Sequence, residues 1–121
     1  MAQRILLVGG YGVVGAQVAT MLRRHHPALQ LLIAGRRLEA AAQLATQLGN
    51  AEPIQLDTHA TDPLEAVTGT LDAVIMLVHD HDDATLRSAV KRSIPYLDIT
   101  RGNSAQARAY VTTALHTPRA P

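Results

Sequence analysis

The sequence contains no cysteine, no phenylalanine and no tryptophan, and its only lysine is Lys91. Without cysteine, the chain can form no disulfide, no thiolate metal site and no cysteine nucleophile. Without phenylalanine and tryptophan, the core must be built from Leu, Val, Ile and Ala. This composition suits aliphatic strands covered by alanine-rich helices. A phosphate-binding loop that ends in Gly-Lys-Ser/Thr is also excluded, because that tripeptide does not occur.

The chain has little net charge and no long apolar run. Eleven Lys and Arg residues against ten Asp and Glu give a net charge of +1, and the basic residues are scattered, which argues against nucleic-acid binding. The apolar runs are too short to span a bilayer, and a first strand beginning by Arg4 leaves no room for a signal peptide. We therefore expect one globular, cytoplasmic domain of 121 residues that binds neither nucleic acid nor membrane.

Residues 5–15, ILLVGGYGVVG, form the most informative stretch of the chain. Four aliphatic residues lead into a glycine-rich turn, and an amphipathic segment follows, which predicts a strand, a turn and a helix. The turn fits the spacing G-x-G-x-x-G, in which the glycines permit a tight turn, approach of a diphosphate, and close packing of the helix. The alternative interpretation is a purely structural turn. The diphosphate is predicted to bind Gly10, Gly12 and Gly15 with the backbone of Tyr11 and Val13, and Val14 is also a predicted cofactor-binding residue.

The rest of the chain alternates strands with helices. Apolar runs predict further strands at residues 30–34, 52–56, 73–78 and 96–99. The first helix is expected to bury Val14, Val18, Met21 and Leu22. The second helix buries residues at 41, 44, 45 and 48 and ends at Gly49. A short helix at 63–67 is expected to be capped by Asp62, and the next helix by Asp82 or Asp83. A last helix is expected over residues 107–115.

This alternation predicts an α/β fold with parallel strands and right-handed crossovers. The glycine turn after the first strand favours a Rossmann-type three-layer αβα domain with strand order 3-2-1-4-5. We expect the domain to cover residues 1–116, with 117–121 forming a tail or the start of a linker. Ligand should bind beyond the carboxyl ends of the first and fourth strands, near Gly10, Val78 and His79.

The end of the second strand favours NADP over NAD as the bound dinucleotide. An NAD site usually has an acidic residue here for the ribose 2′-hydroxyl, whereas this chain has Gly35, Arg36 and Arg37. Glycine leaves room for a 2′-phosphate, and a guanidinium can bind it with two hydrogen bonds. The alternative is that both arginines are ordinary solvated charges. Asp57, after the third strand, is placed either to meet the adenine or its ribose or to form an Asx turn.

Residues 79–83, HDHDD, combine imidazole and carboxylate groups that often bind metals. One compact loop seldom supplies a complete set of ligands, and helix capping explains some of the aspartates, so we expect no metal site. His79 is placed to act as a general acid or base, but the sequence offers no partner for it. No catalytic residue is assigned.

The motifs together resemble the N-terminal NAD(P)-binding domain of the saccharopine dehydrogenase and reductase family. The resemblance rests on residues 5–15, 34–37, 71–75 and 96–100. It implies the cofactor-binding part of an NAD(P)-dependent oxidoreductase, with a C-terminal α+β domain that completes the substrate site. The isolated chain is then expected to be inactive. The family's Gly-Pro and Gly-Glu pairs after the fourth and fifth strands are replaced by His79-Asp80 and Arg101-Gly102.

Two other functions fit parts of the sequence. Gly9, Gly12 and Gly15 also match the glycine spacing of extended short-chain dehydrogenases, but their Tyr-x-x-x-Lys pair is missing, because Tyr96 and Tyr110 have no lysine four residues later. The other alternative is a non-catalytic sensor in which dinucleotide binding biases an interface. The sequence leaves open whether the chain forms a homo-oligomer.

Overall fold

The computed structural model describes residues 3–100, so the predicted helix over 107–115 and the tail at 117–121 lie outside the described residues. The strands of the described part are β1 (Arg4–Val8), β2 (Gln30–Gly35), β3 (Ala51–Gln55), β4 (Ala73–Met76) and β5 (Tyr96–Asp98). The helices are α1 (Val13–His25), α2 (Leu38–Leu48) and α3 (Ala84–Lys91), with short 3-10 turns η1 (Pro63–Ala66) and η2 (His81–Asp83).

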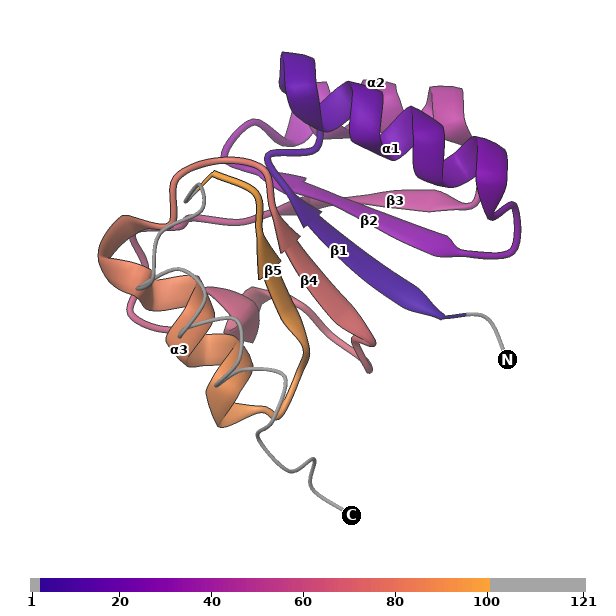
Figure 1. Ribbon diagram of the computed structural model, residues 1–121. Helices are drawn as coiled ribbons and strands as arrows, with labels where there is room; N and C mark the ends of the chain where they lie inside the picture. The colour runs from indigo at the N-terminus through magenta and orange to yellow at the C-terminus, as the bar shows by residue number, and fades with distance from the viewer. Residues whose placement is uncertain (1–2, 101–121) are drawn as a thin grey trace.

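The strands form one parallel sheet in the order β3-β2-β1-β4-β5, which confirms the predicted Rossmann-type αβα fold. Helices α1 and α2 cover one face of the sheet, and α3 with η1 covers the other (Figure 1). Alternate residues of β1 serve the two cores, since Leu7 packs toward α1 and α2 while Leu6 and Val8 pack toward α3 and η1. Helix α1 follows β1 on one face of the sheet, and α3 follows β4 on the other face. The carboxyl ends of these two neighbouring strands therefore lie where the chain changes from one face to the other.

Helix α1 is rotated relative to the buried face predicted from its sequence. Gly15 and Ala19 are its buried residues, whereas Val14 is 52% and Met21 is 60% exposed. The cause is the close contact between Gly15 and the glycine turn, which directs the small residues toward the sheet. Val14 and Met21 then point away, because successive helix residues are about 100° apart. The predicted burial of Val14 and Met21 was wrong.

Helix α3 is capped by a different aspartate from those predicted. Asp80, which is 2% exposed, accepts hydrogen bonds from the Thr85 and Leu86 N–H groups at 2.9 Å each, and the Tyr96 hydroxyl donates to it at 2.7 Å. Asp82 and Asp83 both have positive φ angles, and no side-chain cap bond comes from Asp83 at the N-cap position. The turn before α3 therefore places the buried carboxylate of Asp80, rather than that of Asp82 or Asp83, beneath the start of the helix.

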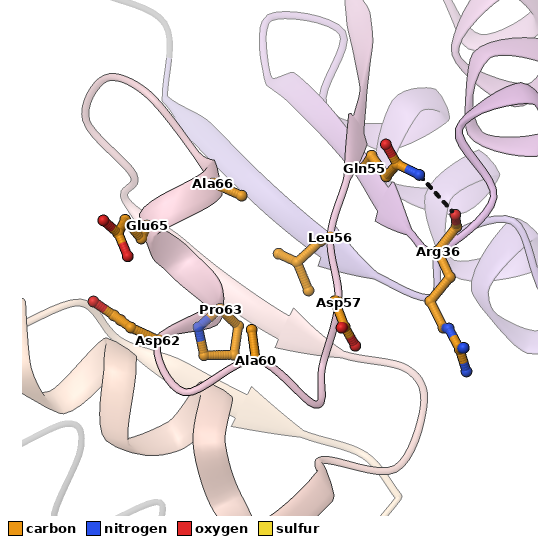
Figure 2. A pocket seen from close by; sticks show the side chains of 9 residues that line it. All are labelled: Arg36, Gln55, Leu56, Asp57, Ala60, Asp62, Pro63, Glu65 and Ala66. Carbon is orange, nitrogen blue, oxygen red and sulfur yellow. Dashed lines mark hydrogen bonds between the residues drawn. The ribbon is translucent and has the colours of Figure 1, made fainter.

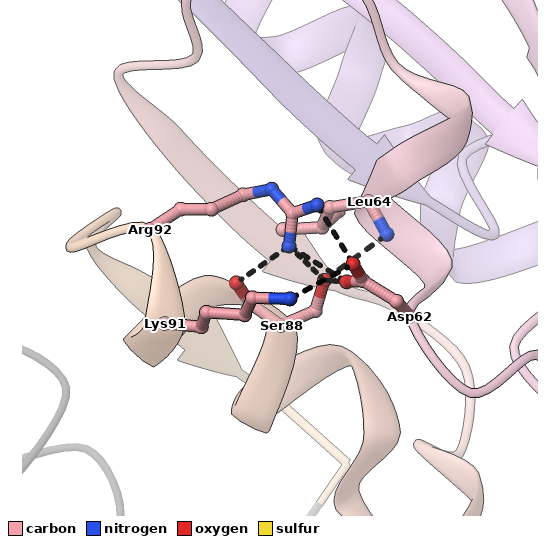
Figure 3. A network of polar contacts seen from close by, with 5 residues as sticks. All are labelled: Asp62, Leu64, Ser88, Lys91 and Arg92. Atoms are coloured by element: carbon pink, nitrogen blue, oxygen red, sulfur yellow. Dashed lines mark hydrogen bonds and ion pairs between the residues drawn. The ribbon is translucent and has the colours of Figure 1, made fainter.

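Asp62 links η1 to α3 instead of capping η1 (Figure 3). Its carboxylate accepts hydrogen bonds from Arg92 at 2.6 and 2.9 Å and from the Ser88 hydroxyl, and Lys91 Nζ lies 3.5 Å away. Ser88 Oγ in turn accepts the Leu64 N–H at 3.2 Å. The hydrogen bonds from Arg92, and then from Ser88, hold the pKa of the Asp62 carboxyl well below its usual range.

This pKa shift predicts an acid-dependent loss of stability. Because the folded-state pKa lies below the unfolded value of about 3.9, the network stabilises the fold above about pH 4, and this contribution is lost as pH falls further. Asp62→Asn should lower the thermal midpoint by a few degrees at pH 7, with the difference from wild type shrinking toward pH 2.5. Melting both proteins across this pH range tests the prediction, with Glu39→Gln on α2 as the control. A difference that stays constant would contradict it.

Candidate functional site

The glycine turn is held between the ends of β2 and β4. Gly9 has φ +85°, and its N–H donates to the Ala34 carbonyl at 2.7 Å. A Cβ on Gly9 would lie 2.4 Å from Val78 Cγ1. The Gly12 N–H donates back to the Gly9 carbonyl at 3.1 Å. Only glycine fits at position 9, because both its backbone conformation and its contact with Val78 disfavour a side chain.

The other glycines of the turn have distinct surroundings. A Cβ on Gly15 would lie 2.2 Å from the Gly9 carbonyl oxygen, so Gly15 provides the close packing of α1 on the turn. A Cβ on Gly10 would lie 3.2 Å from Leu7 Cβ, on the core side. A Cβ on Gly12 would meet nothing closer than 3.5 Å, which is ordinary van der Waals contact. Packing within the described protein therefore explains glycine at 9 and 15 but not at 12.

The start of α1 has the features of an anion site. Gly12 is the N-cap in an extended conformation, no described side chain caps the helix, and its first turn holds no acidic residue. Val13 is 82% and Val14 is 52% exposed, so no described residue covers the helix start. The N–H groups of a helix's first turn have no partners within the helix, and they attract negative charge. This end of α1 can bind a phosphate group.

A cavity of about 320 Å³ lies over the carboxyl edge of the sheet. Its lining comes from the glycine turn, the end of β2 and the segments after β3 and β4: Val8, Gly9, Tyr11, Gly12, Gly35, Arg36, Leu56, Thr58, His59, Val78, His79 and His81. It brings together six predicted site residues, namely Tyr11, Gly12, Gly35, Arg36, Val78 and His79. The predicted residues Gly10, Val13, Val14, Gly15, Arg37 and Asp57 do not line it.

A second cavity, of about 660 Å³, adjoins the first on the β3 side (Figure 2). Arg36 and Leu56 line both cavities. Figure 2 shows Arg36 and Asp57 toward one end and Asp62 and Glu65 toward the other. The remaining lining residues are Gln55, Ala60, Pro63 and Ala66. The two cavities together run from the helix start, past the end of β2, to the segment after β3.

Arg36 and Arg37 are exposed, and within residues 3–100 their guanidinium groups make no hydrogen bond or ion pair. Other arginines of the fold are engaged: Arg4 pairs with Glu52 at 3.1 Å, and Arg92 pairs with Asp62. Among the described residues, the structure therefore gives the guanidinium groups of Arg36 and Arg37 no role in holding the fold together.

Asp57 forms the Asx turn that was one of its two predicted roles. Its Oδ1 accepts the His59 N–H at 2.9 Å, and its carbonyl accepts the Ala60 N–H at 3.1 Å. The residue also lines the larger cavity. A structural role and a position at the candidate site therefore coincide.

Two histidines at the site, His59 and His81, were not among the predicted cofactor-binding residues, and His81 was considered only as a metal ligand within residues 79–83. The His59 and His81 rings stack with their centroids 3.9 Å apart and 17° between their planes, and both line the smaller cavity beside His79. The available signal was that both follow strand ends at the same edge of the sheet. His81 also pairs with Asp82 at 3.2 Å. Among residues 3–100, no three His or acidic side chains are arranged to hold a metal ion.

Tyr96 is placed too deeply to act on a substrate. It is 1% exposed, and its hydroxyl lies 2.7 Å from Asp80 and 3.1 Å from Asp98. It is therefore part of a buried network that joins β5 to the start of α3. In the described part of the chain, no helix has the length and apolar character needed to cross a membrane.

Comparison with known proteins identifies the fold's relatives. The profile of the family described as "Saccharopine dehydrogenase NADP binding domain" matches residues 5–118. Apo saccharopine dehydrogenase (L-Glu forming) from Saccharomyces cerevisiae is 25% identical over 89% of this chain and 24% of its own, with a TM-score of 0.71. A myo-inositol dehydrogenase from Corynebacterium glutamicum is 31% identical over 81% of this chain and 28% of its own, with a TM-score of 0.60.

More distant structures share the fold alone. A short-chain dehydrogenase/reductase from Veillonella parvula, solved in complex with NADP, is 14% identical over 80% of this chain and 46% of its own, with a TM-score of 0.60. No curated protein matches the sequence. The chain spans about a quarter of the length of the yeast and Corynebacterium proteins.

Proposed function

This chain belongs to the saccharopine dehydrogenase NADP-binding domain family, and from that premise we propose that it binds NADP in preference to NAD within an oxidoreductase. Membership makes it a nicotinamide dinucleotide-binding domain. The preference for the 2′-phosphorylated cofactor rests on one observation: the guanidinium groups of Arg36 and Arg37 have no partner in the described fold beside the end of β2.

We assign the two halves of the dinucleotide to the two adjoining cavities. The diphosphate binds at the start of α1, against the backbone from Gly10 to Gly15, where Gly12 leaves the approach open. The adenosine extends past Arg36 toward the larger cavity, near Asp57. The nicotinamide half lies toward the end of β4, near Val78 and His79. The sheet order supports a cofactor centred at the switch point between β1 and β4.

The charge near the adenosine ribose favours a phosphate. A 2′-phosphate is a strong hydrogen-bond acceptor that a guanidinium binds through two parallel bonds. An NAD site would need a carboxylate beside the ribose, but Asp57 lies after β3 and accepts the His59 N–H. Arg36 and Arg37 therefore fit the phosphorylated cofactor better than NAD.

The proposed chemistry is hydride transfer, which the nicotinamide supplies when it is bound. The residues of this chain bind and orient the cofactor. We assign the domain to residues 1–116 and place the start of a linker to a substrate domain at 117–121. The greater length of both dehydrogenases described above supports a larger whole protein. A cytoplasmic location stays a prediction.

Replacing Arg36 tests the cofactor preference. Arg36→Ala should weaken NADPH binding about 10- to 100-fold, because a hydrogen bond to a charged group contributes about 1.5–3 kcal/mol. NADH binding should change little. The measurement is a calorimetric titration of each nucleotide into wild type, Arg36→Ala and the control Arg24→Ala, whose arginine lies on the exposed side of α1. An unchanged ratio of the two affinities in Arg36→Ala would overturn the assignment.

A further inference from the structure

The side chain of Tyr11 reaches from the glycine turn to the end of β2. A Cβ on Gly35 would lie 2.3 Å from Tyr11 Cε1 and 2.5 Å from its hydroxyl oxygen, so the phenol ring fills the space beside Gly35. The sequence suggested that this space accommodates a 2′-phosphate directly and that Tyr11 contributes only its backbone. In the structure, Gly35 makes room for the ring, and the ring forms the surface that a ribose substituent would meet.

The Tyr11 hydroxyl accepts one hydrogen bond and can still donate another. It accepts the backbone N–H of Arg37 at 3.1 Å. A phenol can also donate its own proton, and within residues 3–100 the Tyr11 hydroxyl donates to no acceptor. The ring is half-buried against the apolar cluster beneath α1 and α2, which limits its movement. The hydroxyl is therefore free to donate a hydrogen bond at the smaller cavity, which Tyr11 lines with Gly35 and Arg36.

An acceptor-only group suits this arrangement. Phosphate oxygens accept hydrogen bonds strongly, and Arg36 and Arg37 supply the positive charge in the same turn. The hydroxyl on an unphosphorylated ribose carries no charge and gains less from either group. We propose that the Tyr11 hydroxyl is a specificity-determining group that donates a hydrogen bond to the cofactor's 2′-phosphate while it holds the Arg37 backbone in place. This inference rests on the proposed dinucleotide-binding function.

A purely structural role for Tyr11 makes a different prediction. A phenylalanine ring would fill the same space beside Gly35 and would keep the contact with the apolar cluster. If packing were the whole role, Tyr11→Phe would leave the relative affinities for NADPH and NADH unchanged. The ratio of these affinities, rather than either one alone, therefore separates specificity from packing.

The test is a calorimetric titration of the full chain and Tyr11→Phe with NADPH, NADH, 2′,5′-ADP and 5′-AMP. We expect about a 10-fold loss of affinity for NADPH and 2′,5′-ADP, in keeping with one hydrogen bond to a charged group. NADH and 5′-AMP should change by no more than about twofold, since they lack the 2′-phosphate. Tyr96→Phe is the matched control, because it removes a hydroxyl from the buried Asp80 network outside the cavity. It should alter stability while leaving the NADPH-to-NADH ratio at the wild-type value.

The outcomes separate this inference from the function on which it rests. If the wild type binds NADPH and Tyr11→Phe keeps the same ratio, the inference is overturned and the proposed function stands. An equal loss of affinity for NADPH and NADH also overturns the inference, because that result would mean that the Tyr11 hydroxyl only supports the structure of the glycine turn. If the wild type binds neither NADPH nor NADH, both are overturned. Thermal melts of each variant establish that the measured proteins are folded.

Discussion

Gly12→Ala is expected to lower the affinity for NADPH about 100-fold or more while leaving the fold at least as stable as the wild type. The added methyl group meets nothing closer than 3.5 Å in the described structure, and the φ of −70° at this position suits alanine. Alanine also restricts the unfolded chain, which favours folding by about 0.4–1 kcal/mol where the backbone is compatible. Stability therefore gives no reason for glycine at position 12.

The expected loss of affinity follows from the proposed position of the diphosphate. The methyl group would stand at the start of α1, on the surface that the phosphate oxygens approach. Crowding of about 1–3 kcal/mol adds to the loss of hydrogen bonds to a charged group, about 1.5–3 kcal/mol. Titration calorimetry with NADPH, together with urea unfolding without nucleotide, measures the two effects separately. Wild-type affinity in Gly12→Ala would show that the diphosphate lies elsewhere.

Gly15→Ala should behave in the opposite way, destabilising the fold by about 3 kcal/mol even without nucleotide. Its methyl group would lie 2.2 Å from the Gly9 carbonyl oxygen and 2.8 Å from Gly10 Cα. These are backbone atoms of a turn already fixed by the hydrogen bond from Gly9 to Ala34, so they cannot rotate aside as a flexible side chain would. Helix α1 must instead move away from the sheet.

Urea unfolding of the apo proteins tests this second prediction, with Gly12→Ala as the control from the same turn. The midpoint should fall for Gly15→Ala and not for Gly12→Ala. If Gly15→Ala were as stable as wild type, α1 would not be packed on the glycine turn as described. The pair thus separates a glycine required by the fold from one required by the ligand.

The sheet order was predictable from the sequence because it depends on local signals. The glycine turn follows an apolar strand, strands alternate with helices, and right-handed crossovers leave few arrangements. The end of α2 at Gly49 was predictable for the same reason. Each depends on residues that are neighbours in the chain.

The features that were not predicted depend on contacts between distant segments. The orientation of α1 follows from the close contact between Gly15 and the glycine turn. The spacing of apolar residues along the helix does not reveal that contact. The choice of Asp80 over its neighbours depends on its burial against Tyr96, sixteen residues later. Similarly, the sequence placed Tyr11 and Gly35 at the same site but did not indicate that the ring of one fills the space beside the other.

The binding of NADP in preference to NAD can be measured by thermal unfolding of the full chain with NADPH, with NADH and without nucleotide. A ligand that binds only the folded state adds about 2.7 kcal/mol of stability at 100 times its dissociation constant. We expect NADPH to raise the unfolding midpoint. NADH should need a concentration roughly 10 to 100 times higher for an equal rise, the factor expected from charged hydrogen bonds to the 2′-phosphate. Equal responses to the two nucleotides would contradict the preference for NADP, and no response to either would contradict dinucleotide binding itself.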